Sequence, residues 1–140
     1  MFRRFVSGSA IASIGIACAA FIVLVTPGLG AQRFYPLMYL WGFAPLAWGL
    51  WAALAPSNWV PERLPIWGAI LGVMAGVLAM FGLNVPYRVL GVVVPVIGRA
   101  AGVAVAAVGY YFLWMLVRLA YRSLDKPAPM AEKPVAAKAA

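Results

Sequence analysis

The sequence predicts an all-α integral membrane protein in which four transmembrane helices form a small bundle. Of its 140 residues 66% are hydrophobic and only 10% are charged, whereas soluble domains are about 25% charged. The charged residues leave four charge-free stretches, each close to the roughly 20 residues needed to cross a bilayer core of about 30 Å. These predicted spans cover residues 6–26, 35–55, 64–83 and 100–117.

The spans take up most of the chain, so we expect one membrane domain over residues 1–122 and a short tail over residues 123–140. The tail is rich in proline, alanine and lysine and lacks an apolar pattern. Such a composition cannot bury enough apolar surface to fold, so the tail is predicted to be disordered.

The first span has three interpretations. Arg3 and Arg4 precede an apolar run, as in a secretory signal peptide that would be cleaved near residues 29–31. A lipoprotein would use Cys18, but the apolar residues that follow it belong in lipid. The run is longer than a usual signal core, and Leu29 is bulky where a small residue is preferred. A retained helix is therefore favoured, with Cys18 as a small apolar residue within it.

The second span is rich in aromatic residues and carries Pro45 near its middle. Proline removes a backbone N–H and should kink the helix. Such a kink usually reflects packing geometry, although it can also mark a cavity. Pro45, Trp48 and Trp51 are therefore candidates for an apolar pocket.

Glycines at four-residue spacing mark the third span, at Gly68, Gly72 and Gly76. Residues four apart share a helix face, and glycines there let another helix approach closely. The face predicts either packing inside the bundle or an interface for self-association or another transmembrane protein. The fourth span repeats the pattern more weakly, with Gly98, Gly102 and Ala106.

A ten-residue apolar segment, 89–98, precedes the last span and is bracketed by Arg88 and Arg99. It is too short to span, so an interfacial or re-entrant piece is favoured. Both arginines would then reach lipid headgroups or another anion. The alternative is one long helix from about residue 89 to 117, kinked at Pro95.

The residue inventory argues against an enzyme and against a cofactor or metal site. The chain has no histidine and one cysteine, which removes the usual haem, zinc and iron–sulfur ligands. Its three acids, Glu62, Asp125 and Glu132, lie outside the spans. A proton relay would need acids inside the spans, at membrane depth. Glu62 is expected to pair with the adjacent Arg63 as loop charges.

Positive charge predicts that both termini are cytoplasmic, since Lys and Arg concentrate on that side. One side of the predicted layout carries eight of these residues and the other carries three; the eight are Arg3, Arg4, Arg63, Arg118, Arg122, Lys126, Lys133 and Lys138, and the three are Arg33, Arg88 and Arg99. The net charge of +8 is thus spread over loops and tail. This spread favours contact with membrane lipids over nucleic acid.

Aromatic residues near the ends of the spans predict belts at the two membrane interfaces. The inner belt would contain Trp51, Trp59, Trp67, Trp114 and Tyr121, and the outer belt Phe34, Tyr35, Tyr39, Phe81 and Tyr87. The abundance of alanine, glycine, valine and arginine is typical of a bacterial inner (plasma) membrane protein.

These features favour a non-catalytic accessory or structural subunit of a larger membrane complex, because small-residue faces invite helix neighbours. A self-assembling pore, channel or holin-like protein is the first alternative, although the spans show no clear polar stripe. A small lipid or small-molecule transporter is the second.

Overall fold

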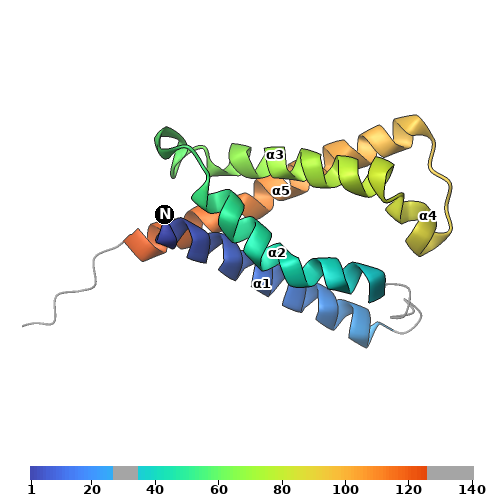
Figure 1. Ribbon diagram of the computed structural model, residues 1–140, viewed down its shortest axis with the longest axis horizontal. Coiled ribbons are helices and arrows are strands. Elements are labelled where there is room, and N and C mark those ends of the chain that lie inside the picture. Colours follow the sequence, from blue (N-terminus) through green and yellow to red (C-terminus); the bar gives the residue numbers. More distant parts are fainter. Residues whose placement is uncertain (27–34, 126–140) are drawn as a thin grey trace, which may run out of the picture.

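The computed structural model describes residues 1–26 and 35–125, and every regular element among them is helical (Figure 1). The α-helices are α1 (Phe2–Val25), α2 (Tyr35–Ala53), α3 (Leu64–Val77), α4 (Val85–Leu90) and α5 (Val96–Asp125). A 3₁₀ turn (Ser57–Trp59) lies between α2 and α3, and a π-helical turn (Leu78–Gly82) extends α3. Residues 126–140, most of the predicted tail, lie outside the described residues.

Within the described residues, three helical stretches are long and apolar enough to cross a membrane: Phe2–Val25, Leu64–Gly82 and Val96–Leu124. The prediction of an all-helical, membrane-embedded protein is therefore confirmed. The predicted count of four spans is not confirmed, because α2, which has 19 residues, is not among the three.

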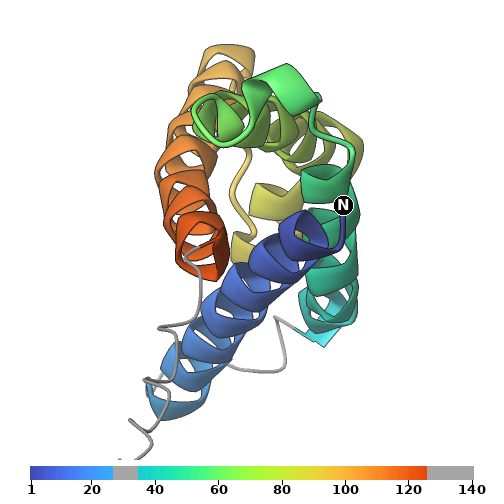
Figure 2. The same cartoon turned by 90° about the vertical axis from the view of Figure 1, so that its left-hand side faces the viewer.

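The long helices form two pairs. α1 packs against α2 and α3 packs against α5, with a smaller contact between α1 and α5. Figure 1 shows the pairs meeting at the end that holds the N-terminus and the end of α5, and diverging toward α4. Figure 2, seen from the end that holds the N-terminus, shows α3 and α5 side by side and α1 next to α2.

Small residues bring α1 and α2 together. A Cβ at Gly8 would lie 2.7 Å from the carbonyl oxygen of Trp48, and one at Gly49 would overlap the side chain of Ser9. The Ser9 hydroxyl also donates to the carbonyl oxygen of Pro45 at 2.8 Å. Close to Pro45, side chains of α1 therefore contact the backbone of α2 directly. This contact was not predicted, although Gly8 and Ala12 are four residues apart and so share a face.

The core lies where the two pairs meet. Its buried residues come from α1, α2, α3 and α5 and from the turn after α2, and they are Ala12, Trp48, Ala52, Ala55, Leu64, Trp114 and Val117. Arg4 donates to the carbonyl oxygen of Ala55 at 2.8 Å, which ties the start of α1 to the end of α2. The free energy of burial is thus concentrated at one end of the molecule.

Two tryptophans connect α2 to α3 at this end. The rings of Trp51 and Trp67 stack with centroids 4.7 Å apart, and each indole N–H donates to the other residue's carbonyl oxygen, at 3.0 and 2.8 Å. Trp59 meets Trp67 edge to face. Trp114 is fully buried. These residues, predicted to form an interfacial belt, therefore pack largely against one another and the core.

Residues 89–98, predicted as one interfacial or re-entrant segment, do not form a single element. α4 ends at Leu90, where Gly91 adopts a left-handed conformation (φ 69°) that glycine tolerates. Residues 91–95 have no regular secondary structure, and α5 begins directly after Pro95, whose missing N–H disfavours a helix that would run through it. The predicted interfacial or re-entrant segment is therefore not confirmed, and the alternative of one kinked helix from residue 89 is wrong, because the helix is interrupted between Leu90 and Val96.

α5 is longer than its predicted span at both ends. At its start the Arg99 Nε donates to the carbonyl oxygen of Val94 at 3.0 Å. Toward its end Arg118 and Arg122 bind the two carboxylate oxygens of Glu62, at 2.7 and 2.5 Å. These arginines have partners and lie inside α5. The helix continues to Asp125, which includes the first residues of the predicted tail. The expected pairing of Glu62 with its neighbour Arg63 is replaced by this contact with α5.

Candidate functional site

The glycine face of α3 packs against α5 of the same chain. A Cβ at Gly68 would overlap the Trp114 ring, and one at Gly72 would lie 2.7 Å from Tyr110 Cβ. One at Gly76 would lie 3.0 Å from the Cα of the facing α5 turn. All three glycines are buried. Of the two uses predicted for this face, packing inside the bundle is the one present here.

The weaker pattern on α5 serves two different contacts. Ala106 faces Gly72 and Gly76, so it belongs to the α3–α5 contact. Gly102 lies against the end of the Met80 side chain. Gly98, in the first turn of α5, has Val94 and Pro95 of the preceding segment as its nearest neighbours. Gly102 and Ala106 therefore face α3 and its π-helical extension, whereas Gly98 packs on the segment that precedes α5.

A shallow apolar groove of about 390 Å³ lies on the other side of α5. It is lined by Ala104, Val105, Val108 and Gly109. A Cβ added at Gly109 would meet nothing within 4 Å. At 3.6 residues per turn these positions point away from the α5 residues that face α3. This surface was not predicted from the sequence, where its signal is the run of small residues at 104–109.

The two candidate headgroup-binding arginines lie at the α4 end of the molecule. Arg88 is exposed, in the last turn of α4. Arg99 is half-buried, bonded to Val94, with its guanidinium carbon 6.0 Å from the centre of the Phe81 ring. They flank an apolar connection whose Val93 and Ile97 are 76% and 85% exposed. The arrangement presents positive charge beside exposed apolar side chains.

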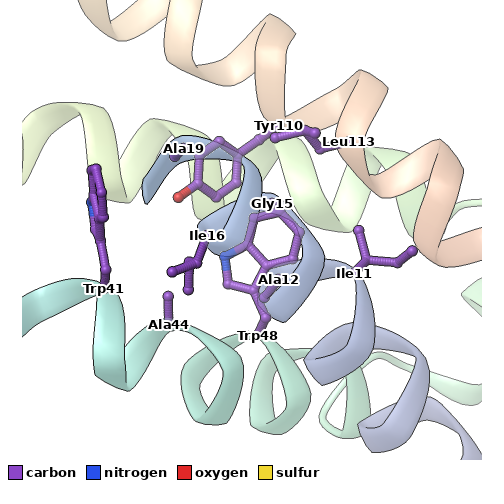
Figure 3. Close-up of a pocket in the computed structure, with 10 residues that line it drawn as sticks. All are labelled: Ile11, Ala12, Gly15, Ile16, Ala19, Trp41, Ala44, Trp48, Tyr110 and Leu113. Carbon is purple, nitrogen blue, oxygen red and sulfur yellow. The ribbon is translucent and has the colours of Figure 1, made fainter. Parts of the chain in front are cut away.

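A second hollow, of about 360 Å³, lies between α1, α2 and α5 (Figure 3). Small residues of α1 make room for it, and aromatic rings from α2 and α5 form its walls. The lining residues are Ile11, Ala12, Gly15, Ile16, Ala19, Trp41, Ala44, Trp48, Tyr110 and Leu113. We call it the interpair cavity, because it separates the α1–α2 pair from α5.

The interpair cavity includes one of the three residues predicted to form an apolar pocket. Trp48 lines it. Pro45 instead offers its carbonyl to Ser9, and Trp51 stacks on Trp67 away from it. Tyr110 was not predicted as a site residue, although it lies four residues from Trp114 and so on the same face of α5.

Three of the residues that line this otherwise apolar cavity carry groups that can donate a hydrogen bond, and the Tyr110 hydroxyl can also accept one. The three groups are the indole N–H groups of Trp41 and Trp48 and the hydroxyl of Tyr110. None makes a hydrogen bond to another described residue. Figure 3 shows the Tyr110 oxygen and the nitrogen edge of Trp48 on the side where Ile16 lies. Trp114 Nε1 also lacks a partner, but it is enclosed in the core.

The part of the chain that the structure describes holds no group of three or more Cys, Asp or Glu side chains able to bind a metal ion. Comparison of the chain with protein-family models, with curated proteins and with solved structures found no match.

Proposed function

We propose that this protein is a non-catalytic accessory subunit of a larger membrane complex, and that a transmembrane helix of its partner docks in the groove on α5. The observation that carries the proposal is the groove itself, in which Gly109 leaves open space beside Ala104 and Val108. Small residues let helix backbones approach closely, which is the usual basis of helix association in lipid.

The packing of α3 supports this choice of surface. Gly72 and its neighbours are covered by α5, so a partner that used the glycine face would have to displace α5. The groove needs no such rearrangement, because it lies on the uncovered side of α5. Self-association through the groove would give a homo-oligomer, the arrangement expected of a pore or channel.

We further propose four spans, with α2 as the additional one, in a bacterial inner membrane with both termini in the cytoplasm. The charge distribution supports this orientation. Arg4, Glu62, Arg118 and Arg122 gather at the end that holds the N-terminus. Positive residues favour the cytoplasmic side. At the opposite end Arg88 and Arg99 are placed to contact lipid headgroups.

The test is extraction of the tagged full-length protein from its native membrane in mild detergent, followed by the intact mass of the complex. We expect a stoichiometric partner that is lost in Gly109→Leu, because leucine would fill the groove. Gly42→Leu is the matched control, since Gly42 is an exposed glycine of α2 with nothing within 4 Å. It should keep the partner.

Other outcomes of this experiment would count against the proposal. A monomer that remains intact and stable in mild detergent would argue against an accessory role. A defined homo-oligomer lost in Gly109→Leu would favour the pore instead, and flux of ions from loaded liposomes would then be the next measurement. A partner that is retained in Gly109→Leu would place the docking surface elsewhere.

A further inference from the structure

The geometry of the interpair cavity points to a binding site for a lipid-soluble ring compound that carries carbonyl oxygens, such as a quinone with an apolar tail. This inference goes beyond the accessory role and does not depend on it. It rests on the position of the cavity, its shape, and the polar groups that line it.

The cavity lies in the middle of the membrane-spanning part. Its α1 residues centre on Gly15, about 15 to 20 Å from either end of α1 at 1.5 Å rise per residue. The surroundings at this depth are hydrocarbon, not water. A ligand that enters from the side must therefore be soluble in the bilayer. The ester groups of phospholipids lie nearer the membrane surface, so their carbonyls are poorly placed to reach this level.

The walls suit a flat, apolar ligand. The Trp48 and Tyr110 rings pack on each other, tilted by 53° with centroids 5.2 Å apart, so a flat ligand would lie against this aromatic pair and not between the rings; Trp41 stands farther along α2. Gly15 has nothing within 4 Å of an added Cβ, so the α1 side is open. The volume of about 360 Å³ falls within the range of about 300–1,000 Å³ that is usual for small-molecule sites.

The polar groups specify hydrogen-bond acceptors on the ligand. Trp48 is 8% exposed, and its indole N–H has no partner among the described residues. The hydroxyl of Tyr110 likewise has no hydrogen-bond partner among the residues that the structure describes. A donor left unpaired in a low-dielectric site is costly, and hydrocarbon offers it no acceptor. Carbonyl oxygens on a ring would satisfy these donors, whereas a plain acyl chain would not.

The test uses the full-length protein in lipid nanodiscs and a tritiated 1,4-benzoquinone with a ten-carbon chain as the probe. Bound probe is measured by scintillation proximity, with empty nanodiscs subtracted to remove partition into lipid. We expect saturable binding at one site per chain. Unlabelled decylbenzene, which has the tail and the ring but no carbonyl, should compete at least tenfold more weakly than the unlabelled quinone.

Variants locate the site. Tyr110→Phe removes one oxygen and keeps the ring that packs on Trp48, so it should weaken binding about fivefold, the value of one hydrogen bond. Gly15→Leu should abolish binding by filling the cavity. Gly42→Leu, the same change in open space on α2, should bind like the unchanged protein. Each variant is first checked for monodispersity by size-exclusion chromatography.

Three results would overturn the inference. The absence of saturable binding would show that bilayer lipid fills the cavity. Equal competition by decylbenzene would show that the site selects apolar volume and not carbonyl groups. Unchanged binding in a monodisperse Gly15→Leu protein would place the quinone outside the interpair cavity.

Discussion

Replacing Gly68 by alanine should push α3 away from α5 and destabilise the protein. The added Cβ would overlap Cβ, Cγ and Cδ1 of Trp114. These atoms sit at the base of the side chain, so no rotation of the ring moves all of them away. Trp114 is 0% exposed and packs on Trp48, with ring centroids 5.7 Å apart, so the residue has no free space to enter.

The magnitude follows from two opposing contributions. Overpacking a close-packed core costs about 1–3 kcal/mol. The glycine-to-alanine change itself favours the helix by up to about 1 kcal/mol. Because the overlap involves three atoms that cannot yield, the upper part of the first range applies, and we expect a net loss of about 2 kcal/mol in the free energy of unfolding.

The assay is a titration of the purified protein in mild detergent with sodium dodecyl sulfate, in which tryptophan fluorescence follows unfolding. Gly109→Ala is the control, because it makes the same change on α5 with nothing within 4 Å. In the Trp114→Gly background all three overlapping atoms are gone, so adding Gly68→Ala should cost little. This non-additivity identifies the direct contact. If Gly68→Ala unfolded at the same detergent fraction as Gly109→Ala, the proposed α3–α5 packing would be refuted.

Four further predictions follow. Trp51→Phe should lower the free energy of unfolding by about 1–2 kcal/mol through the lost hydrogen bond and weaker stacking, and adding Trp67→Phe should cost less than the sum, as a double-mutant cycle in the same titration would reveal. Glu62→Gln should cost less than about 1 kcal/mol and only at low salt, because its ion pairs are exposed; an equal loss at high salt would contradict this. Gly91→Ala should cost about 1 kcal/mol, because its positive φ strains alanine; an unchanged thermal midpoint would argue against that conformation. Cys18, exposed on a membrane-spanning helix, should react in membranes with a lipid-soluble maleimide and not with a charged one, and labelling by the charged reagent, read by mass spectrometry, would place it in water.

The long helices could be predicted because their signal is local. About 20 consecutive apolar residues set both the element and its length, so the predicted 64–83 agrees closely with Leu64–Gly82. The ends of α5 could not be found in the same way. Arg99 and Arg118 look like boundaries in the sequence, yet their partners, Val94 and Glu62, let the helix continue.

The candidate sites depend on contacts that no local pattern encodes. The glycine spacing of α3 indicated a packing face, but only the folded chain shows that Trp114 and Tyr110 occupy it. The interpair cavity joins Gly15, Trp48 and Tyr110 from three separate helices. Each of these residues looks ordinary in the sequence, since a glycine or an aromatic ring in a span is commonplace. What sets them apart is the unfilled space between them, which only the arrangement of the three helices reveals.

The concentration of the core at one end has a mechanical consequence. Trp51, Trp67 and Trp114 join the two helix pairs near the N-terminus, and the buried core of the described residues gathers at this end. Each pair can therefore tilt as a rigid body about the contact made by the tryptophans. A tilt of about 5° about this contact carries the far end of α1, a 24-residue helix about 36 Å long, through about 3 Å. Changes in bilayer thickness or lateral pressure would displace the end of α1 that is farthest from the tryptophans more than any part near them.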